Sequence, residues 1–171
     1  MQEKPSTARV ALKWGAISGV VSVVFSLILF LTDQFGNQAL GLFPLVFAIT
    51  FIVLAMREFR TLNNGYLSFG EGFGVGTLVS AIAGLISATF TTIYTSFVDT
   101  TFYERLADKT QEQWEKQGLS DNQIEQASEM TKMFQSPGLL FAIGLLGAVI
   151  FGVILSLIIA AIMRKNRPVF E

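Results

Sequence analysis

The most restrictive feature of this sequence is a set of four long stretches that contain no charged residue. They cover residues 14–32, 34–56, 72–98 and 133–163, with the apolar parts of the second and fourth beginning at Ala39 and Pro137. A helix rises about 1.5 Å per residue, so about 20 residues cross a hydrocarbon core of about 30 Å. Backbone groups within lipid must be hydrogen-bonded inside their own segment, so each stretch is expected to be helical.

The sequence therefore predicts an all-α polytopic membrane protein in which residues 1–171 form a single membrane domain. The expected transmembrane helices cover about residues 14–32, 39–56, 69–98 and 137–163. Only 15% of the residues are charged and 51% are hydrophobic, whereas soluble domains carry about 25% charged residues. A signal peptide is the alternative for the first stretch, but its length and the lack of a small-residue cleavage site favour a retained helix.

The distribution of Lys and Arg predicts the orientation in the membrane. Residues 33–38 contain no basic residue, and the long loop after the third helix contains four. The other eight lie near the two termini and the turn between the second and third helices: Lys4, Arg9, Lys13, Arg57, Arg60, Arg164, Lys165 and Arg167. Basic residues concentrate on the cytoplasmic side, so both termini are expected in the cytoplasm and the long loop outside it.

The long loop, about residues 99–136, is predicted to form an extracytoplasmic helical hairpin. Thr100 to Gln117 can form one helix, with Asp99 or Thr100 as its cap and Gly118 as its stop. A second helix follows Ser120, which with Gln123 fits a capping box. Its apolar residues recur at helical spacing: Ile124, Ala127, Met130 and Phe134.

Acidic side chains recur along both helices of this predicted hairpin. They form two rows at a spacing of four: Glu104, Asp108 and Glu112, then Asp121, Glu125 and Glu129. Such rows could bind a divalent cation through oxygen ligands. We favour a solvated face instead, since basic residues are interspersed and no calcium-binding consensus is present, and we expect neither a metal nor another cofactor.

The stretch SFGEGFGVG, residues 68–76, has two interpretations. Its glycines have neither the spacing of a dinucleotide fingerprint nor the Gly-Lys-Ser/Thr ending of a phosphate-binding loop. Ser68 and Glu71 fit a capping box, which predicts a helix that starts at Phe69. The glycines then form two pairs spaced by four, Gly70 with Gly74 and Gly72 with Gly76, on different faces of that helix.

Small residues form stripes along the predicted third and fourth membrane helices. On the third helix, they alternate spacings of four and three: Gly70, Gly74, Thr77, Ala81, Gly84, Ala88, Thr91 and Thr95. On the fourth, they recur every four residues: Gly144, Ala148, Gly152, Ser156 and Ala160. Small side chains allow the close backbone contact that holds membrane helices together. Packing within one bundle is the favoured interpretation, and association of Gly144, Ala148, Gly152 and Ser156 with a second chain is the alternative.

The first two predicted helices carry weaker signals. The first contains Gly15 and Gly19, which are four residues apart, and the second is bulkier and is expected to face more lipid. Pro44 is expected either to kink the second helix or to lie in its first turn.

The chain lacks the residue types on which most catalytic sites depend. It has no histidine and no cysteine, which removes the usual general base near neutral pH, thiol chemistry and thiolate metal sites. An enzyme would have to use carboxylates such as Glu71 or Asp99, so we expect no catalytic residues. The net charge of −1 gives no reason to expect nucleic acid as a partner.

A transport function would usually place an ionisable residue within the membrane, and none lies near the middle of a predicted helix. A line of polar residues nevertheless follows the third helix: Ser80, Ser87, Thr91 and Tyr94. Packing hydrogen bonds explain this line, and a narrow path through an oligomer explains it equally well.

Several segments together resemble the bacterial membrane family called domain of unknown function 4199. They are Gly15 and Gly19 near the start of the first helix, NNGYLSFGEGFGVG at residues 63–76, IYTSFVDTTFYE at 93–104 and GLSDNQIE at 118–125. The resemblance covers nearly all of the chain. It implies a four-helix protein of the inner membrane of a Gram-negative bacterium, and it carries over no active-site residue.

These observations together predict a non-enzymatic inner-membrane protein that acts through helix packing. Its expected partners are the lipid bilayer and either another membrane protein or further copies of the chain. An accessory or scaffold subunit, or a homo-oligomer, is the leading hypothesis. A small oligomeric channel or transporter is the alternative.

Overall fold

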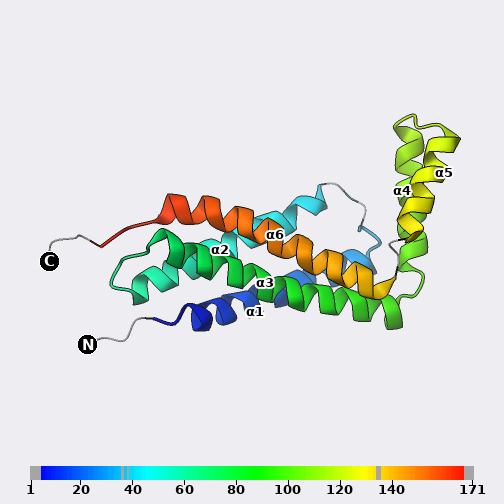
Figure 1. The fold of residues 1–171 in the computed structure, drawn as a ribbon. Helices are drawn as coiled ribbons and strands as arrows, with labels where there is room; N and C mark the ends of the chain where they lie inside the picture. The colour runs from blue at the N-terminus through cyan, green and yellow to red at the C-terminus, as the bar shows by residue number, and fades with distance from the viewer. Residues whose placement is uncertain (1–4, 36, 38, 134–135, 168–171) are drawn as a thin grey trace.

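The computed structural model describes residues 5–35, 37, 39–133 and 136–167, and in this part of the chain every regular element is helical. Its elements are α1 (Thr7–Leu31), a 3-10 turn (Leu40–Leu42), α2 (Phe43–Leu62), α3 (Phe69–Ile93), a π-helical turn (Tyr94–Val98), α4 (Phe102–Lys116), α5 (Asp121–Met133) and α6 (Pro137–Met163). Figure 1 shows α1, α2, α3 and α6 as an elongated bundle, with α4 and α5 standing across one end. The predicted all-α fold is confirmed.

Four of these segments are long and apolar enough to cross a membrane: α1, α2 with its preceding 3-10 turn, α3 with its π-helical turn, and α6. The last two segments coincide with the predicted ranges 69–98 and 137–163. The first two helices are longer than predicted, because α1 already begins at Thr7 and α2 continues to Leu62. An uncharged stretch marks only the apolar part of a helix, and these helices continue through charged turns at their ends.

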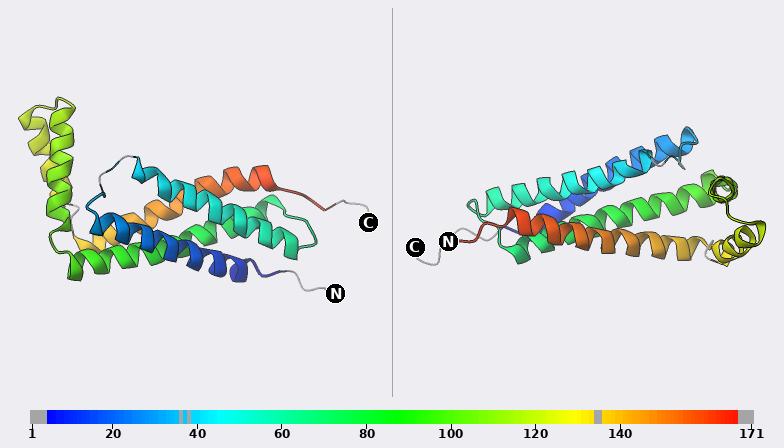
Figure 2. Two further views of the ribbon diagram at one scale, coloured as in Figure 1. Left: turned by 180° about the vertical axis from the view of Figure 1, so that it is seen from behind. Right: turned by 90° about the horizontal axis from the view of Figure 1, so that it is seen from above.

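The bundle has two distinct ends. The start of α1, the turn between α2 and α3, and the end of α6 lie together at what we call the terminal end (Figure 1). The hairpin of α4 and α5 lies at the opposite end, which we call the hairpin end (Figure 2).

Helix α3 is the centre of the bundle, since its most extensive contacts are with α6 and α1. Two glycines of α1 bring its backbone against α3. A β-carbon added to Gly15 would lie 2.7 Å from the β-carbon of Ile82, and one added to Gly19 would lie 2.8 Å from the δ-carbon of Ile86. Both residues therefore have to be glycine for α1 and α3 to pack this closely.

The hydrophobic core is concentrated toward the terminal end. The buried residues of α2 lie within Ile52–Phe59, and those of α6 lie within Gly152–Ala160. The apolar side chains among them form one cluster with Val10, Ala11, Leu67, Val75 and Val79. Figure 2 shows α2 and α6 separating from one another toward the hairpin end. The bundle is thus closed at one end and more open at the other.

The helix boundaries at the hairpin end follow local backbone chemistry. Pro44 lies in the first turn of α2, where its missing N–H costs no helical hydrogen bond. Helix α4 ends at the predicted stop: Gly118 has a φ of 81°, and the N–H of Leu119 donates to the carbonyl of Trp114 at 3.2 Å.

The predicted start of α4 was wrong, because Thr101 is the capping position and makes no side-chain capping bond. Asp99 instead accepts a hydrogen bond from the Thr101 hydroxyl and pairs with Arg105. At the start of α5, the Gln123 side chain accepts from the backbone N–H of Ser120 at 3.0 Å. Lys4 and Phe134 lie outside the described residues.

Candidate functional site

Helices α3 and α6 run antiparallel and meet through small residues at matching steps of four. The four facing pairs are Gly72 with Ala160, Gly76 with Ser156, Ser80 with Gly152, and Gly84 with Ala148. A β-carbon added to Gly152 would lie 2.1 Å from the β-carbon of Ser80, and one added to Gly84 would lie 2.7 Å from that of Ala148. No side chain larger than hydrogen fits at either glycine.

This contact shows where the predicted packing residues of α6 lie. Ala148, Gly152 and Ser156 all face α3 within the same chain, which is the arrangement expected for packing inside one bundle. Gly152 and Ser156 are buried there and form no free association surface. Gly144 differs, because nothing lies within 4 Å of a β-carbon added to it.

On α3, the predicted stripe is only partly the packing face. Gly84 contacts α6, but Gly70 faces open space and Gly74 comes near only Thr7. The face that packs on α6 keeps the spacing of four, because it has to match the spacing of four on an antiparallel partner. The predicted stripe with alternating spacings therefore does not coincide with the face that packs on α6, although Gly70 and Gly74 do lie in the first turns of α3.

A cavity of about 480 Å³ lies among the four bundle helices. It is lined by apolar and small side chains from all four of them, together with Tyr103 of α4. Its hydroxyl-bearing lining residues are Ser18, Ser22, Ser80, Ser87, Thr91, Thr92 and Tyr103. Among the described residues that line it, none is Asp, Glu, Lys or Arg. The cavity is thus uncharged and mostly apolar, with several groups that can form hydrogen bonds.

Three of the four residues predicted as a polar path, Ser80, Ser87 and Thr91, line this cavity. Tyr94 does not; it is buried, and its ring stacks on Phe30 with 4.9 Å between the centroids. Ile52, 0% exposed, and Val79, 1% exposed, line the cavity and also belong to the closed core. The cavity therefore ends at the packed half of the bundle.

The turn at the terminal end is held by a capping box and by the segment after α6. Ser68 accepts a hydrogen bond from the N–H of Glu71 at 3.3 Å, and the Glu71 carboxylate accepts from the N–H of Ser68 at 2.9 Å. The backbones of Leu67 and Lys165 exchange two hydrogen bonds, of 2.9 and 2.7 Å. The Glu71 side chain thus stabilises the first turn of α3 as part of its N-terminal cap.

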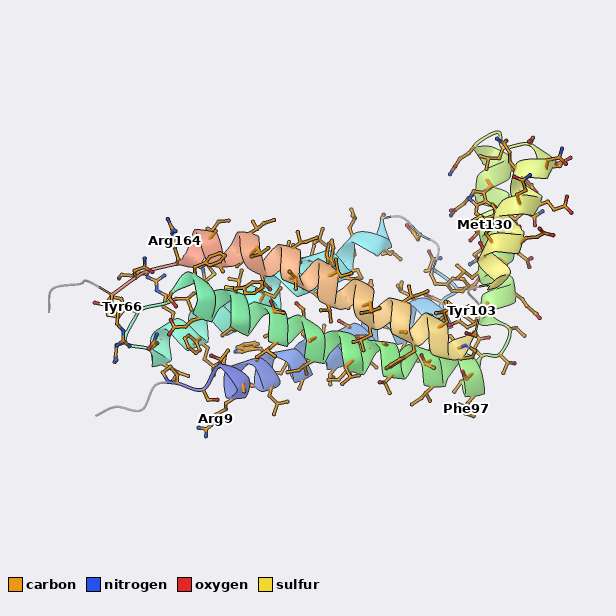
Figure 3. The ribbon with its side chains drawn as sticks, viewed as in Figure 1. Arg9, Tyr66, Phe97, Tyr103, Met130 and Arg164 are labelled. Atoms are coloured by element: carbon orange, nitrogen blue, oxygen red, sulfur yellow. The ribbon has the colours of Figure 1, made fainter. Side chains whose placement is uncertain are left out.

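Asn63 connects the same turn to the end of the chain. It is 2% exposed, and its amide donates to the carbonyl of Tyr66 at 3.1 Å. Its side-chain oxygen accepts a hydrogen bond from Arg167 at 2.8 Å. Figure 3 shows Tyr66 and Arg164 at this end of the molecule. The NNGY sequence therefore belongs to a structural clamp.

A second group of charges holds the hairpin to the bundle. Arg105 pairs with Asp99 and, at 2.6 Å, with Asp33 in the turn after α1. Lys109 pairs with Asp33 at 2.8 Å and lies 4.2 Å from the ring centre of Phe35. The hydrogen bond from Lys109 lowers the pKa of Asp33 below its ordinary value of 3.8. Asp99, predicted as a conceivable catalytic carboxylate, has a structural contact here.

Sequence reasoning missed the charged contacts between separate segments, and one of these lies at the terminal end. Lys13 pairs with Glu58 at 2.7 Å, and the indole N–H of Trp14 donates to the same carboxylate oxygen at 2.8 Å. These contacts connect α1 to α2. No local pattern marks them, since the partners are far apart in the sequence.

The acidic rows of the hairpin do not gather around a common point. Within the described residues, no three acidic side chains approach one another closely enough to hold a metal ion. Lys116 pairs with Glu112 at 3.7 Å on the exposed face of α4.

Comparison with known protein families matches residues 13–165 to the family described as "Protein of unknown function (DUF4199)". This match covers most of the chain, including the capping box, the cavity and the hairpin. No curated protein and no solved structure matches the chain.

Proposed function

The chain belongs to this family of unknown function, and we propose that it is a non-enzymatic accessory or scaffold subunit of the bacterial inner membrane. Its four long apolar helices support a membrane location. In this proposal both termini lie in the cytoplasm, and the hairpin of α4 and α5 binds another membrane protein outside it.

The charges at the terminal end support this orientation. The described basic residues there are Arg9, Lys13, Arg57, Arg60, Arg164, Lys165 and Arg167. Only two described acidic residues, Glu58 and Glu71, accompany them. An excess of Lys and Arg near helix ends is typical of the cytoplasmic side.

The observation that carries the proposal is the way the hairpin is attached. Its contacts with the bundle are at its base, where Arg105 and Lys109 pair with Asp33, and where the Thr95 hydroxyl donates to Tyr103 at 3.3 Å. Figure 1 shows the remainder of the hairpin projecting past the side of the bundle. A projecting hairpin held at its base offers its surface to a second protein.

The hairpin's own composition favours a protein partner over the lipid surface. Its small apolar interior includes Ile124, which is 6% exposed, and the partly buried Trp114. Residues 99–132 carry eight acidic and four basic residues, and this acidic excess would be repelled by anionic lipid headgroups. The complementary partner surface is expected to be basic.

Site-specific photo-cross-linking in the native membrane tests this proposal. A photoreactive amino acid at Glu112 or Glu125, both exposed on the hairpin, should give one defined protein product. The same group at Val46, 54% exposed on α2, serves as the lipid-facing control and should not give that product. The absence of a protein product at both hairpin positions, with the protein present at normal levels, would reject the hairpin as a binding surface.

The channel or transporter remains a second candidate because Ser80, Ser87 and Thr91 share one cavity. A conducting path would require this cavity to continue past Ile52 and Val79, which close it at the packed half. Reconstituted protein should then pass a solute at a rate that falls in a Ser87→Leu variant. No flux across a broad panel of ions and neutral solutes would count against this function.

A further inference from the structure

We propose that the cavity among the bundle helices binds a neutral, lipid-soluble molecule that carries a carbonyl group. Its polar head would lie inside the cavity, and its hydrocarbon tail would leave between α2 and α6 into the bilayer. The inference rests on the membrane location and does not depend on whether the hairpin binds a partner.

The size and polarity of the cavity define this class of ligand. Its volume of about 480 Å³ falls within the range of roughly 300–1,000 Å³ typical of small-molecule sites. No Asp, Glu, Lys or Arg is among the described lining residues, so a charged or zwitterionic head would lose its hydration without gaining a counter-charge. A neutral head group avoids this cost.

The hydroxyl of Ser18 indicates that the ligand carries a hydrogen-bond acceptor. Ser18 lines the cavity and is 4% exposed, and its side-chain hydroxyl forms no hydrogen bond within the described part of the chain. Buried polar groups are almost always paired. Ser80, which also lines the cavity, donates to the carbonyl of Gly76 at 3.1 Å. Ser18 thus has a free donor, and a carbonyl oxygen is the natural acceptor.

The cavity exists because α3 and α6 stop contacting each other closely toward the hairpin end, although both helices still carry small residues there. Continuing the steps of four beyond Gly84 and Ala148 would pair Ala88 with Gly144. A β-carbon added to Gly144 would have nothing within 4 Å, so the two helices have already separated there. A molecule bound in the space between the two helices would gain van der Waals contacts with its walls.

The entrance follows from the packing of α2 and α6. Their buried residues all lie toward the terminal end, and Figure 2 shows the two helices separated near the hairpin end. Leu45 of α2 and Phe141 of α6 line the cavity in this separated region. Tyr103, labelled in Figure 3 where α4 meets the bundle, lines it from the hairpin side. A hydrocarbon tail can therefore leave sideways into lipid.

Native mass spectrometry of the purified full chain tests this inference. The probes are decylubiquinone, which has quinone carbonyls, dioleoylglycerol, which has ester carbonyls, and zwitterionic dioleoylphosphatidylcholine. We expect one molecule of a neutral probe to be retained per chain, and phosphatidylcholine to be retained at least tenfold more weakly. Retention of the quinone alone, or of dioleoylglycerol alone, would each support the site and identify the source of the carbonyl.

Gly144→Leu is the decisive variant, because its side chain enters open space in the cavity without displacing a packed neighbour. It should weaken retention of the neutral probe at least tenfold. Gly147→Leu is the matched control on the same helix: Gly147 has nothing within 4 Å of an added β-carbon and does not line the cavity. It should retain the probe as the unmodified chain does.

Ser18→Ala provides a second test that leaves the volume of the cavity nearly unchanged. The loss of one neutral hydrogen bond should weaken retention roughly three- to tenfold. Ser26→Ala, on the same helix but outside the lining, should have no effect. The inference would be overturned by equal retention in folded Gly144→Leu and Ser18→Ala variants, by phosphatidylcholine binding as tightly as the neutral probes, or by no retention of any probe.

Discussion

At several positions of the α3–α6 contact, a single hydrogen atom is the largest side chain that fits. A β-carbon on Gly152 would lie 2.1 Å from the β-carbon of Ser80, far inside contact distance. The two helices would have to move apart to accept it. Close helix contact in lipid depends on such positions, because lipid tails are as apolar as the side chains they replace.

We therefore expect Gly152→Ala to lower the free energy of unfolding by about 1–3 kcal/mol, the usual cost of overpacking. Thermal unfolding of the purified protein in one detergent measures this change. Gly147→Ala is the matched control on α6, since a β-carbon there meets nothing within 4 Å. Equal stability of the two variants would mean that α3 and α6 do not pack as described.

Asp33, which lies outside the membrane helices, makes the stability of the contact between the hairpin and the bundle depend on pH. The pKa of Asp33 is lowered in the folded chain, chiefly by its hydrogen bond with Lys109. The ionised carboxylate therefore stabilises the folded form at pH values above 3.8, which is the pKa of this group in the unfolded chain. This contribution is lost as the pH falls through the lower, folded pKa. Arg105 faces the same carboxylate and is shared with Asp99.

Acidification below pH 3.8 should therefore loosen α4 from the turn after α1. Spin labels at Asn37 and Gln113 can report the distance between the two segments, because the chain has no cysteine of its own. Asp33→Asn should show the looser distance distribution already at neutral pH, with a smaller change on acidification. A distribution that stays the same when the pH is lowered from 7 until the Asp33 carboxylate is protonated would contradict this role for Asp33.

Local patterns predicted the residues whose partners lie close in sequence. Ser68 and Glu71 could be identified because a capping box has a fixed spacing of three. The contact between Lys13 and Glu58 and the unpaired hydroxyl of Ser18 had no such signal. Both depend on which helices become neighbours, and this information is absent from a local pattern.

Among the helices, α3 has the most clearly defined ends. It starts at the capping box, and its last regular turn widens into the π-helical turn Tyr94–Val98, where the N–H of Asp99 donates to the carbonyl of Tyr94 at 2.9 Å. This turn leads from Tyr94, stacked on Phe30, to Asp99, paired with Arg105. Such π-helical turns are frequent at functional sites.

Removing the cap should affect α3 at its first turn. Ser68→Ala is expected to destabilise the protein by about 0.5–2 kcal/mol, the usual cost of losing an N-cap side chain. Hydrogen exchange should become faster at the amides of residues 69–72. Ser96→Ala, which removes a hydroxyl at the other end of the same segment, is the control. Unchanged exchange in residues 69–72 of the Ser68→Ala variant would show that the cap contributes nothing.

The type and extent of the helices were easier to predict than the faces they use. Helix α6 has the predicted range, because its apolar residues end at Met163 and basic residues follow. The start of α1 was missed because the helix continues through Arg9 and Lys13. The face of α3 that packs on α6 could not be identified from the sequence, because the small residues of α3 lie on more than one side and only the spacing on α6 selects among them.

The whole molecule combines a closed terminal end with an open hairpin end. The clamp around Asn63 and the buried core hold the first, whereas the second contains the cavity and the base of the hairpin. In the proposed orientation, the open end faces away from the cytoplasm. The orientation therefore decides on which side of the membrane the hairpin end lies.

Single cysteines test this orientation, since the natural chain has none to interfere. With an outer membrane made permeable, a membrane-impermeant maleimide should label Gln126→Cys on the hairpin directly. Asn166→Cys, after α6, should be labelled only once the inner membrane is also opened. Direct labelling of Asn166→Cys with protection of Gln126→Cys would show that the protein is inserted the other way round.

The central proposal, that this chain is a subunit of a larger membrane assembly, is tested most directly by the composition of its native complex. The measurement is purification of the tagged chain after cross-linking in its own membrane, followed by mass spectrometry and determination of the particle mass. We predict a stoichiometric second membrane protein that is cross-linked to α4 or α5. Only monomers or self-complexes, recovered in good yield, would contradict the subunit function and favour the channel.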